Sequence, residues 1–258
     1  MRELPDKLTP LPPGKFTLAL LRAWASYFGQ GPGLRSLACV VAQLVLESGR
    51  AKQPDGSWLW GQGYAPGLGA HNFNWGNIKH KGDDDPNDFQ FFECAEWIFD
   101  AKKGRSVFHR FKPRHPQCKF RAYDSAEEGF SDYLNFLIRR RDGAYLEAWN
   151  RGVYEGDPIT FARELGAAGY YTAPVERYTK TLVSIFESVL PTCQEVIESP
   201  KGQLVFAPEK EARDRHTLDL VALTLWENFR SEYGDGVASV DEVSLRETIT
   251  TNLPDEAA

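Results

Sequence analysis

Glu47 is the residue whose sequence surroundings best suit acid–base chemistry. It ends an apolar helical pattern that runs from Leu34 to Arg50, and Gly49 then supplies the left-handed stop that helix ends favour. A carboxyl group at the end of such a helix, before a loop rich in glycine and tryptophan, lies at the edge of a core. Partial loss of water there raises its pKa, which a general acid needs near neutral pH. Glu47 is therefore a candidate general acid, and a plain surface glutamate is the alternative.

A second segment strengthens the case for Glu47. Residues His71 to Lys79 read His-Asn-Phe-Asn-Trp-Gly-Asn-Ile-Lys and follow the loop rich in glycine and tryptophan. The Leu-Glu-Ser-Gly around Glu47, followed by Asn-Trp-Gly-Asn-Ile-Lys, resembles the N-acetylglucosaminidase family of peptidoglycan hydrolases. The usual signature of that family is Leu-Glu-Ser-Gly followed by Asn-Leu-Phe-Gly-Ile-Lys. The resemblance implies a lysozyme-like fold in which Glu47 is the essential general acid.

A third segment extends the resemblance, which covers about Phe16 to Leu190. The family carries Ala-Gly-Tyr-Ala-Thr-Asp-Pro where this chain has Ala-Gly-Tyr-Tyr-Thr-Ala-Pro, so Tyr170 takes the place of the cleft tyrosine. A tyrosine can hydrogen-bond an N-acetyl group or a water while its ring packs on a sugar. Ala173 replaces the aspartate of the family, and the neighbouring Tyr171 leaves a shift of one position open. The substrate contacts expected with this resemblance come from Asn74, Trp75, Asn77, Lys79, Trp97 and Tyr171.

Glycosidases generally use a second carboxyl group. The family often has Thr-x-Glu before an aromatic or apolar residue on a hairpin strand, and Cys94-Ala95-Glu96-Trp97 is the nearest match. Glu96 is therefore the expected second catalytic carboxylate, with Glu93 and Asp100 as rivals. If the N-acetyl group of the substrate is the nucleophile, the second carboxylate only orients and stabilises.

The lobe that carries Glu96 also contains cysteine, histidine and basic residues. Cys94 and Cys118 could form a disulfide, could bind zinc with His109 and His115, or could stay as free thiols. The Cys-x14-His-x5-His-x2-Cys spacing is not that of a familiar zinc finger, and we expect neither a metal nor a cofactor. The basic residues between positions 101 and 121 would attract a glycan strand that bears carboxylates. The motifs favour such a glycan over nucleic acid.

The elements that must position these residues follow from periodicity. An amphipathic helix is expected at Lys15 to Phe28. Short β-like runs occupy residues 88–123 with a turn at Lys103-Gly104, and residues 51–70 read as a long loop. Ser125 opens a capping box for the next helix, and Asp157-Pro158 starts another. Pro191 is expected to stop the closing helix.

These elements predict an α+β, mainly α fold: a lysozyme-like helical domain with a small β-hairpin lobe flanking the active-site cleft. We expect an N-terminal lead at 1–15 and the glucosaminidase-like domain at 16–191, with its β-lobe at about 88–123. Residues 192–258 form an acidic, partly helical appendage that is too small for a large core of its own. It is a candidate to dock a carrier or an inhibitor protein.

Composition and net charge limit the partners and the location that we expect for the protein. Apolar residues make up 42% of the sequence, which is enough for a well-buried core, and the net charge of −6 gives no global attraction to nucleic acid or to an anionic wall. No apolar run is long enough for a membrane span, and the N-terminus lacks a signal-peptide core. We expect synthesis in the cytoplasm and delivery to the wall or periplasm by lysis, a phage particle or a dedicated secretion system. An antibacterial effector or a phage lysin would fit this route.

The sequence leaves three hypotheses about the function. The first is an endo-β-N-acetylglucosaminidase that cleaves the β-1,4 bond between N-acetylglucosamine and N-acetylmuramic acid in peptidoglycan, with Glu47 as the acid. The second is a muramidase or lytic transglycosylase on the same scaffold. The third is a non-catalytic module that binds the cell wall, because a fold alone does not prove activity.

Overall fold

The computed structural model describes residues 1–63, 69–82, 85–139 and 143–206, except for the side chains of Glu96, Trp97, Phe99, Asp100 and Ser106. Residues Met1–Val205 form one compact unit. Within it, helices dominate and the strands pair in three small antiparallel sheets. The predicted α+β, mainly α class is confirmed. Residues 207–258 of the predicted acidic, partly helical appendage lie outside the described residues.

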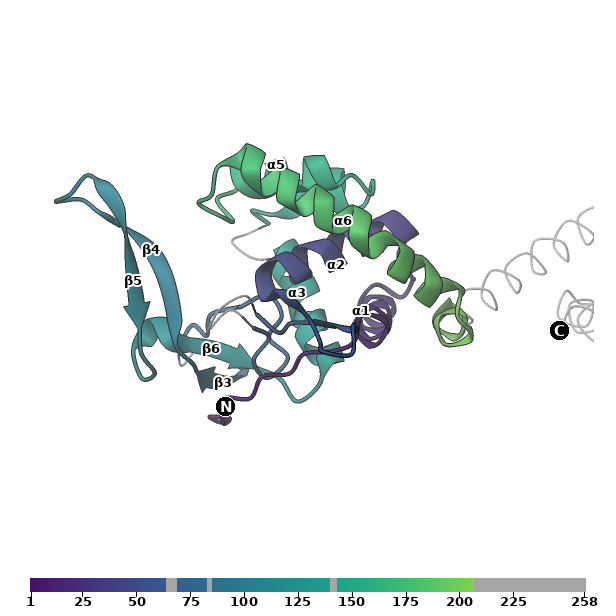
Figure 1. Cartoon of the computed structure of the whole chain (residues 1–258), viewed down its shortest axis with the longest axis horizontal. Helices are drawn as coiled ribbons and strands as arrows, with labels where there is room; N and C mark the ends of the chain where they lie inside the picture. The colour runs from purple at the N-terminus through teal and green to yellow at the C-terminus, as the bar shows by residue number, and fades with distance from the viewer. Residues whose placement is uncertain (64–68, 83–84, 140–142, 207–258) are drawn as a thin grey trace, which may run out of the picture. The chain divides into compact units, whose positions relative to one another are not determined.

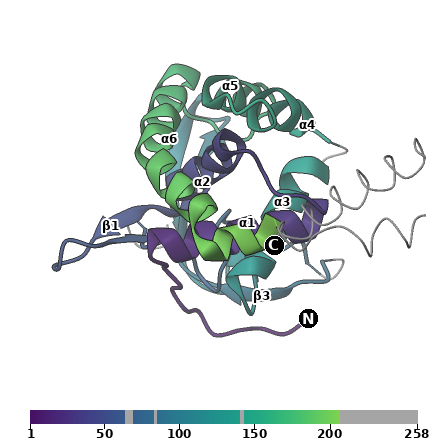
Figure 2. The same cartoon turned by 90° about the vertical axis from the view of Figure 1, so that its right-hand side faces the viewer.

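Three helices build the part of the fold that carries Glu47. Helices α1 (Pro13–Phe28) and α2 (Leu34–Ser48) follow each other in the chain, and α6 (Val175–Glu198) returns to lie along α2 (Figure 2). Apolar residues occupy nearly every position of α2 between Leu37 and Val45, because the helix is enclosed by its neighbours. Gln43 is completely buried in this apolar setting. A polar side chain at such a depth requires hydrogen-bond partners.

The aromatic centre of the domain surrounds Phe16 on α1. Its ring is completely buried and meets the rings of Trp60, Trp75 and Phe130 edge-on, at centroid distances of 5.2, 4.7 and 4.8 Å. Phe130 belongs to α3 (Ala126–Arg139), so this contact joins α1 and α3. The shorter elements α4 (Leu146–Ala148), η3 (Trp149–Val153) and α5 (Pro158–Ala167) complete the helical part.

The strands form separate pairs. Strand β1 (Arg50–Lys52) pairs with β2 (Trp58–Trp60), and β3 (Asp88–Phe91) pairs with β6 (Lys119–Ala122), which follows the short helix η1 (Pro116–Cys118). Strands β4 (Cys94–Asp100) and β5 (Arg105–Phe111) form the predicted hairpin, whose turn includes Gly104 at a φ of 59°. Figure 1 shows this hairpin extending away from the helices. The predicted β-lobe and its turn at Lys103-Gly104 are thus confirmed.

A buried ion-pair network fixes the segment Phe120-Arg121-Ala122-Tyr123 to α3. Arg121 on β6 lies 2.8 Å from Asp85 and 2.7 Å from Asp132, and the hydroxyl of Tyr123 donates to Asp132. The Asp85 side chain has no exposed surface. Because buried charges need partners, these contacts hold β6 in one position against α3.

The N-terminal lead is part of the fold. The Leu4 amide donates to Phe89 O, the Leu11 amide to Trp60 O and the Thr9 amide to Ala70 O. Arg2 binds the carboxylate of Asp88. These contacts run from β3 to β2, so the lead links the strands to α1.

Two expectations about single elements were wrong. Residues 51–70 were predicted to be a loop, but they contain most of the hairpin β1–β2, in which a register of Arg50 to Trp60 places Trp60 in the core. The closing helix was expected to stop at Pro191, but α6 continues to Glu198. Cys193 and Val196 continue its buried face, and their burial outweighs the loss of one helical hydrogen bond at the proline. Among the helices of the described residues, none is long and apolar enough to cross a membrane.

Candidate active site

The carboxyl group of Glu47 is held by one residue from its own helix and one from α6. Gln43, one turn earlier on α2, donates from Nε2 to Glu47 Oε1 at 3.0 Å. The hydroxyl of Tyr178 lies 3.1 Å from the same oxygen and 2.9 Å from Gln43 Oε1. Both donors therefore meet on Oε1. No described residue forms a hydrogen bond with Oε2, which is the oxygen left for a ligand.

This setting gives Glu47 the acidity of a general acid. Burial raises its pKa from 4.5 to about 7, because the carboxylate loses water, while the hydrogen bonds from Tyr178 and Gln43 act in the opposite direction. A carboxylic acid with this pKa is substantially protonated at neutral pH and can donate its proton. The desolvation predicted from the sequence is confirmed.

Tyr170 lies near Glu47, on the segment between α5 and α6. Its ring meets those of Phe136 and Tyr145 edge-on, at centroid distances of 6.2 and 5.4 Å. Burial raises the pKa of its hydroxyl, and the negative charge of Glu47 raises it further. Tyr170 thus stays a neutral phenol close to the carboxyl group, as the role predicted for it requires.

Asn77 joins the second motif to the end of α2. Its Nδ2 donates to the backbone oxygen of Glu47 at 3.2 Å, and its backbone adopts a left-handed φ of 48°, which asparagine tolerates better than most residues. Its Oδ1 is buried and has no hydrogen-bond partner within the described part of the chain. Among the predicted substrate-binding residues whose side chains are described, Asn77 is therefore the one that hydrogen-bonds to Glu47.

The neighbouring Asn74 and Trp75 have structural roles. Asn74 is 1% exposed, and its amide donates to Ile78 O and Arg121 O while its Oδ1 accepts from the Ile78 amide. Trp75 is completely buried against Phe16 and Phe130. An enclosed ring offers no face to a sugar, so both side chains pack the motif in place of the predicted substrate contact.

Gly76 explains why this turn approaches α3 so closely. A Cβ atom at this position would lie 2.4 Å from the ring of Tyr133, which is completely buried. The glycine in the Asn-Trp-Gly-Asn motif therefore lets the backbone near Glu47 pack directly against α3.

Lys79 reaches into the β-lobe. Its Nζ lies 4.0 Å from the centre of the Phe120 ring and donates to Gln117 O and to Cys94 Sγ. These contacts tie the second motif to η1 and the start of β4. The predicted substrate contact of Lys79 stays a prediction.

Tyr171 contacts α5 and the ring of Tyr178. Its hydroxyl donates to Ala162 O on α5 at 2.8 Å, and its ring stacks on that of Tyr178 at 3.6 Å. Tyr171 thus supports the tyrosine that binds Glu47. This placement favours Tyr170 over Tyr171 as the cleft tyrosine, and the predicted substrate contact of Tyr171 stays a prediction.

The candidate second carboxylate lies on the projecting hairpin. Glu96 is on β4 opposite His109, and Trp97 follows it opposite Phe108. The backbone placement agrees with a hairpin strand, while the side chains of Glu96, Trp97 and the rival Asp100 are outside the described part. The other rival, Glu93, pairs with Arg110 at 3.2 Å.

The cysteines and histidines of the lobe form no metal-binding group among the described residues. The sulfur atoms of Cys94 and Cys118 lie 3.7 Å apart without a disulfide between them, inside a small core with Phe92 and Phe120. His115 stacks on Phe111 and caps η1 by accepting from the Gln117 amide.

Sequence reasoning missed Gln43 and Tyr178 as functional residues. Tyr178 was assigned only to the apolar face of α6, because its spacing matches that face. Gln43 carried a usable signal, since a polar residue inside an apolar helix face, one turn before a catalytic candidate, requires a buried partner. That partner could not be identified without the packing of α6 on α2.

The sequence and the structure were compared with those of known proteins. The family model for glucosaminidases, described as mannosyl-glycoprotein endo-β-N-acetylglucosaminidase, matches residues 29–190. No curated protein sequence matches the chain. A solved structure, the catalytic domain of the autolysin Auto from Listeria monocytogenes, aligns with a TM-score of 0.42 and 17% identity over 73% of this chain and 89% of the other. Since the family match spans more than half of the sequence, the chain belongs to the glucosaminidase family and is an endo-β-N-acetylglucosaminidase, a glycoside hydrolase.

Proposed function

We propose that this glucosaminidase cleaves the β-1,4 bond between N-acetylglucosamine and N-acetylmuramic acid in peptidoglycan, with Glu47 as the general acid. One observation carries the assignment of the acid: both hydrogen bonds to the Glu47 carboxyl go to Oε1, and the pKa is raised to about 7. The proton then resides on Oε2 and is donated to the glycosidic oxygen as the bond breaks. Membership of the family and the motifs shared with peptidoglycan hydrolases support the substrate.

The remaining roles follow from placement. Tyr170, beside Glu47, orients the N-acetyl group or the attacking water through its neutral hydroxyl. Glu96, on β4, stabilises the developing positive charge on the sugar or assists attack at the opposite face. Asn77 holds the backbone of Glu47 through Nδ2 and presents its buried Oδ1 beside the site.

The central test is digestion of purified peptidoglycan by the wild type, by Glu47→Gln and by Glu187→Gln, which alters an exposed glutamate on α6. The fragments are reduced with borohydride and weighed by mass spectrometry. We expect reduced N-acetylglucosamine ends from the wild type and from Glu187→Gln, and a loss of about 10²- to 10⁴-fold in rate for Glu47→Gln. Reduced muramic acid ends would indicate a muramidase, and anhydro ends a lytic transglycosylase. Binding of the wall without any cleavage by the wild type would indicate a binding module.

A second comparison tests Glu96. Glu96→Gln is assayed with and without sodium azide, next to Glu93→Gln as the matched neighbour. If Glu96 assists attack, Glu96→Gln loses about 10²-fold or more in kcat, and azide restores part of it. A loss of less than about tenfold would assign the nucleophile to the acetamido group of the substrate. A larger loss for Glu93→Gln would transfer the role to Glu93.

A further inference from the structure

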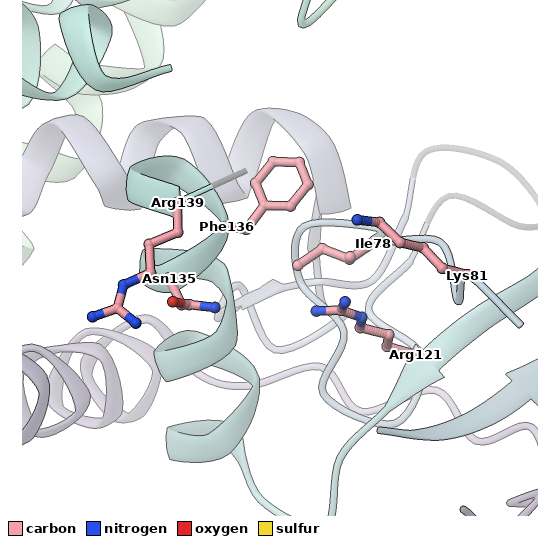
Figure 3. A pocket seen from close by; sticks show the side chains of 6 residues that line it. All are labelled: Ile78, Lys81, Arg121, Asn135, Phe136 and Arg139. Atoms are coloured by element: carbon pink, nitrogen blue, oxygen red, sulfur yellow. The ribbon is translucent and has the colours of Figure 1, made fainter. Parts of the chain in front are cut away.

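A small cavity lies between α3 and the segment that follows Asn77. Its volume is about 160 Å³. It is lined by Ile78, Lys81, Arg121, Asn135, Phe136 and Arg139. Figure 3 shows Lys81 and Arg121 entering from the loop and strand side, with Asn135, Phe136 and Arg139 on the helix. We call this cavity the basic pocket.

The charge of the basic pocket is not balanced by its own lining. Arg121 is neutralised by Asp85 at 2.8 Å and Asp132 at 2.7 Å. Lys81 and Arg139 are exposed, and neither side chain pairs with an acidic residue in the part of the chain that the structure describes. Two cationic groups beside an already paired arginine make a site that favours an anion.

The other lining residues suit a small organic anion. Tyr27 donates to Oδ1 of Asn135 at 3.1 Å, which leaves the Asn135 amide nitrogen as a hydrogen-bond donor. Ile78 and Phe136 add apolar surface. A carboxylate on a short apolar arm would meet donors at one end and carbon atoms along its stem.

The basic pocket lies next to the candidate active site. Ile78 directly follows Asn77, whose side chain donates to the backbone oxygen of Glu47. On the opposite side, the ring of Phe136 is 6.2 Å from the ring of Tyr170. A sugar held between Glu47 and Tyr170 would therefore have a substituent within reach of the pocket.

We propose that the basic pocket binds a carboxylate carried by the N-acetylmuramic acid residue next to the cleaved bond. The inference rests on the proposed function, because it takes peptidoglycan as the substrate. Two sources offer this chemistry: the carboxylate of the lactyl group, free only when no peptide is attached, and the carboxylates of the attached peptide. Neutral glycans such as chitin oligomers lack both.

The test compares three forms of one peptidoglycan preparation. The first is intact, the second has lost its peptides through amidase treatment and exposes lactyl carboxylates, and the third has its carboxylates converted to neutral methylamides. Each is digested by the wild type, Lys81→Ala, Arg139→Ala, the double variant and Lys15→Ala, which removes an exposed lysine from α1. Thermal unfolding of each variant confirms that it is folded.

We expect Lys81→Ala and Arg139→Ala each to lower kcat/KM roughly three- to tenfold on strands with carboxylates, mainly through KM, since the bound group does not react. On methylamidated strands, the wild type should fall to the level of the double variant, and the variants should lose nothing further. Lys15→Ala should match the wild type throughout. If the effect occurs only with intact strands, the peptide carboxylates are bound, and if it persists after amidase treatment, the lactyl carboxylate is bound.

Two results separate the failure of this inference from failure of the function. The wild type could release reduced N-acetylglucosamine ends equally from all three forms, or the double variant could be as sensitive to methylamidation as the wild type. Either result would show that the basic pocket does not bind the carboxylate, and the proposed enzyme activity would still stand. If the wild type releases no such ends from any form, the proposed function itself is overturned.

Discussion

The hydroxyl of Tyr178 lies 3.1 Å from Oε1 of Glu47, although 131 positions separate the two residues in the chain. Helix α6 therefore positions the carboxyl group at the end of α2. The same hydroxyl lies 2.9 Å from Gln43 Oε1, so one phenol orients both Gln43 and Glu47 on α2.

Removing this hydroxyl should change the pH dependence of the enzyme. The Tyr178 hydrogen bond lowers the pKa of Glu47, so in Tyr178→Phe the pKa should rise above about 7. Under the proposed role, Glu47 acts in its protonated form, so the decline of kcat/KM at alkaline pH should move to higher pH, by up to about one unit. The rate at pH 6 should fall roughly tenfold, since the acid is less well oriented. Rates measured from pH 4 to 9 check both effects.

Tyr171→Phe is the matched control for that experiment. It removes a hydroxyl that donates to Ala162 O and leaves the stack on Tyr178 at 3.6 Å unchanged. Its pH profile should match that of the wild type. Equal shifts in both variants would show that the Tyr178 hydroxyl does not act on Glu47 specifically.

Glu47 should reduce the stability of the folded protein at alkaline pH. Its pKa is about 7 in the folded state and 4.5 in the unfolded reference, so the folded state binds more protons between these values. The free energy of unfolding should therefore decrease as pH rises from about 4.5 to about 7. Glu47→Gln lacks this loss and should be more stable than the wild type at pH 8 by up to about 3 kcal/mol. Urea unfolding at pH 5 and pH 8 measures the difference, which should largely vanish at pH 5. A constant difference at both values would contradict the raised pKa.

The Asp85–Arg121 pair should contribute much more stability than a surface pair. Burial opposes the ionisation of Asp85, but hydrogen bonds from Asn87, the Lys81 backbone and Arg121 outweigh it and lower its pKa to about 2. This contribution is present above the usual aspartate pKa and is lost as pH falls through about 2. Asp85→Asn should cost about 3 kcal/mol at pH 7, because the buried Arg121 Nε and the Lys81 amide lose their charged acceptor, while Asp132 still pairs with Arg121.

Asp88→Asn is the control for Asp85→Asn. Its partner Arg2 is 64% exposed, so the loss should stay below about 1 kcal/mol. Urea unfolding curves of the two variants and the wild type give the comparison. Similar losses in both variants would mean that burial does not strengthen the Asp85 pair.

The four cysteines should react in two distinct ways. The sulfur atoms of Cys94 and Cys118 are 3.7 Å apart, so a disulfide-exchange oxidant should couple this pair with small movements of the lobe. Burial raises the pKa of Cys39 and of Cys193 to about 12, so these thiols should stay unmodified in the folded protein. Peptide mapping after oxidation and alkylation distinguishes the two pairs. Any disulfide that contains Cys39 would contradict this assignment.

The sequence was sufficient for the elements whose signals are local. The helix that carries Glu47 follows from apolar periodicity and Gly49, and the hairpin of β4 and β5 follows from the short β-like runs and the turn at Gly104. The capping residue Asp157 was also identified, because its side chain accepts from the Ile159 amide two residues later. Each of these features is decided by residues close together in the chain.

The hydrogen-bond partners of Glu47 could not be predicted from the sequence in the same way. Tyr178 looks like any residue of an apolar helix face until α6 is packed on α2, and Trp75 looks like a sugar-stacking aromatic until Phe16 and Phe130 enclose it. The continuation of α6 past Pro191 likewise depends on the buried side chains that follow the proline. These features depend on contacts between distant segments, for which periodicity carries no information.

The position of Phe16 bears on how the domain can be cut for expression. The family match begins at residue 29, yet the ring at the aromatic centre belongs to α1, upstream of that boundary. A fragment trimmed to the matched residues would leave an empty space between Trp60, Trp75 and Phe130, together with an uncovered face of α3. The minimal folding unit therefore extends upstream of the stretch by which the family is recognised, and α1 belongs to its hydrophobic interior.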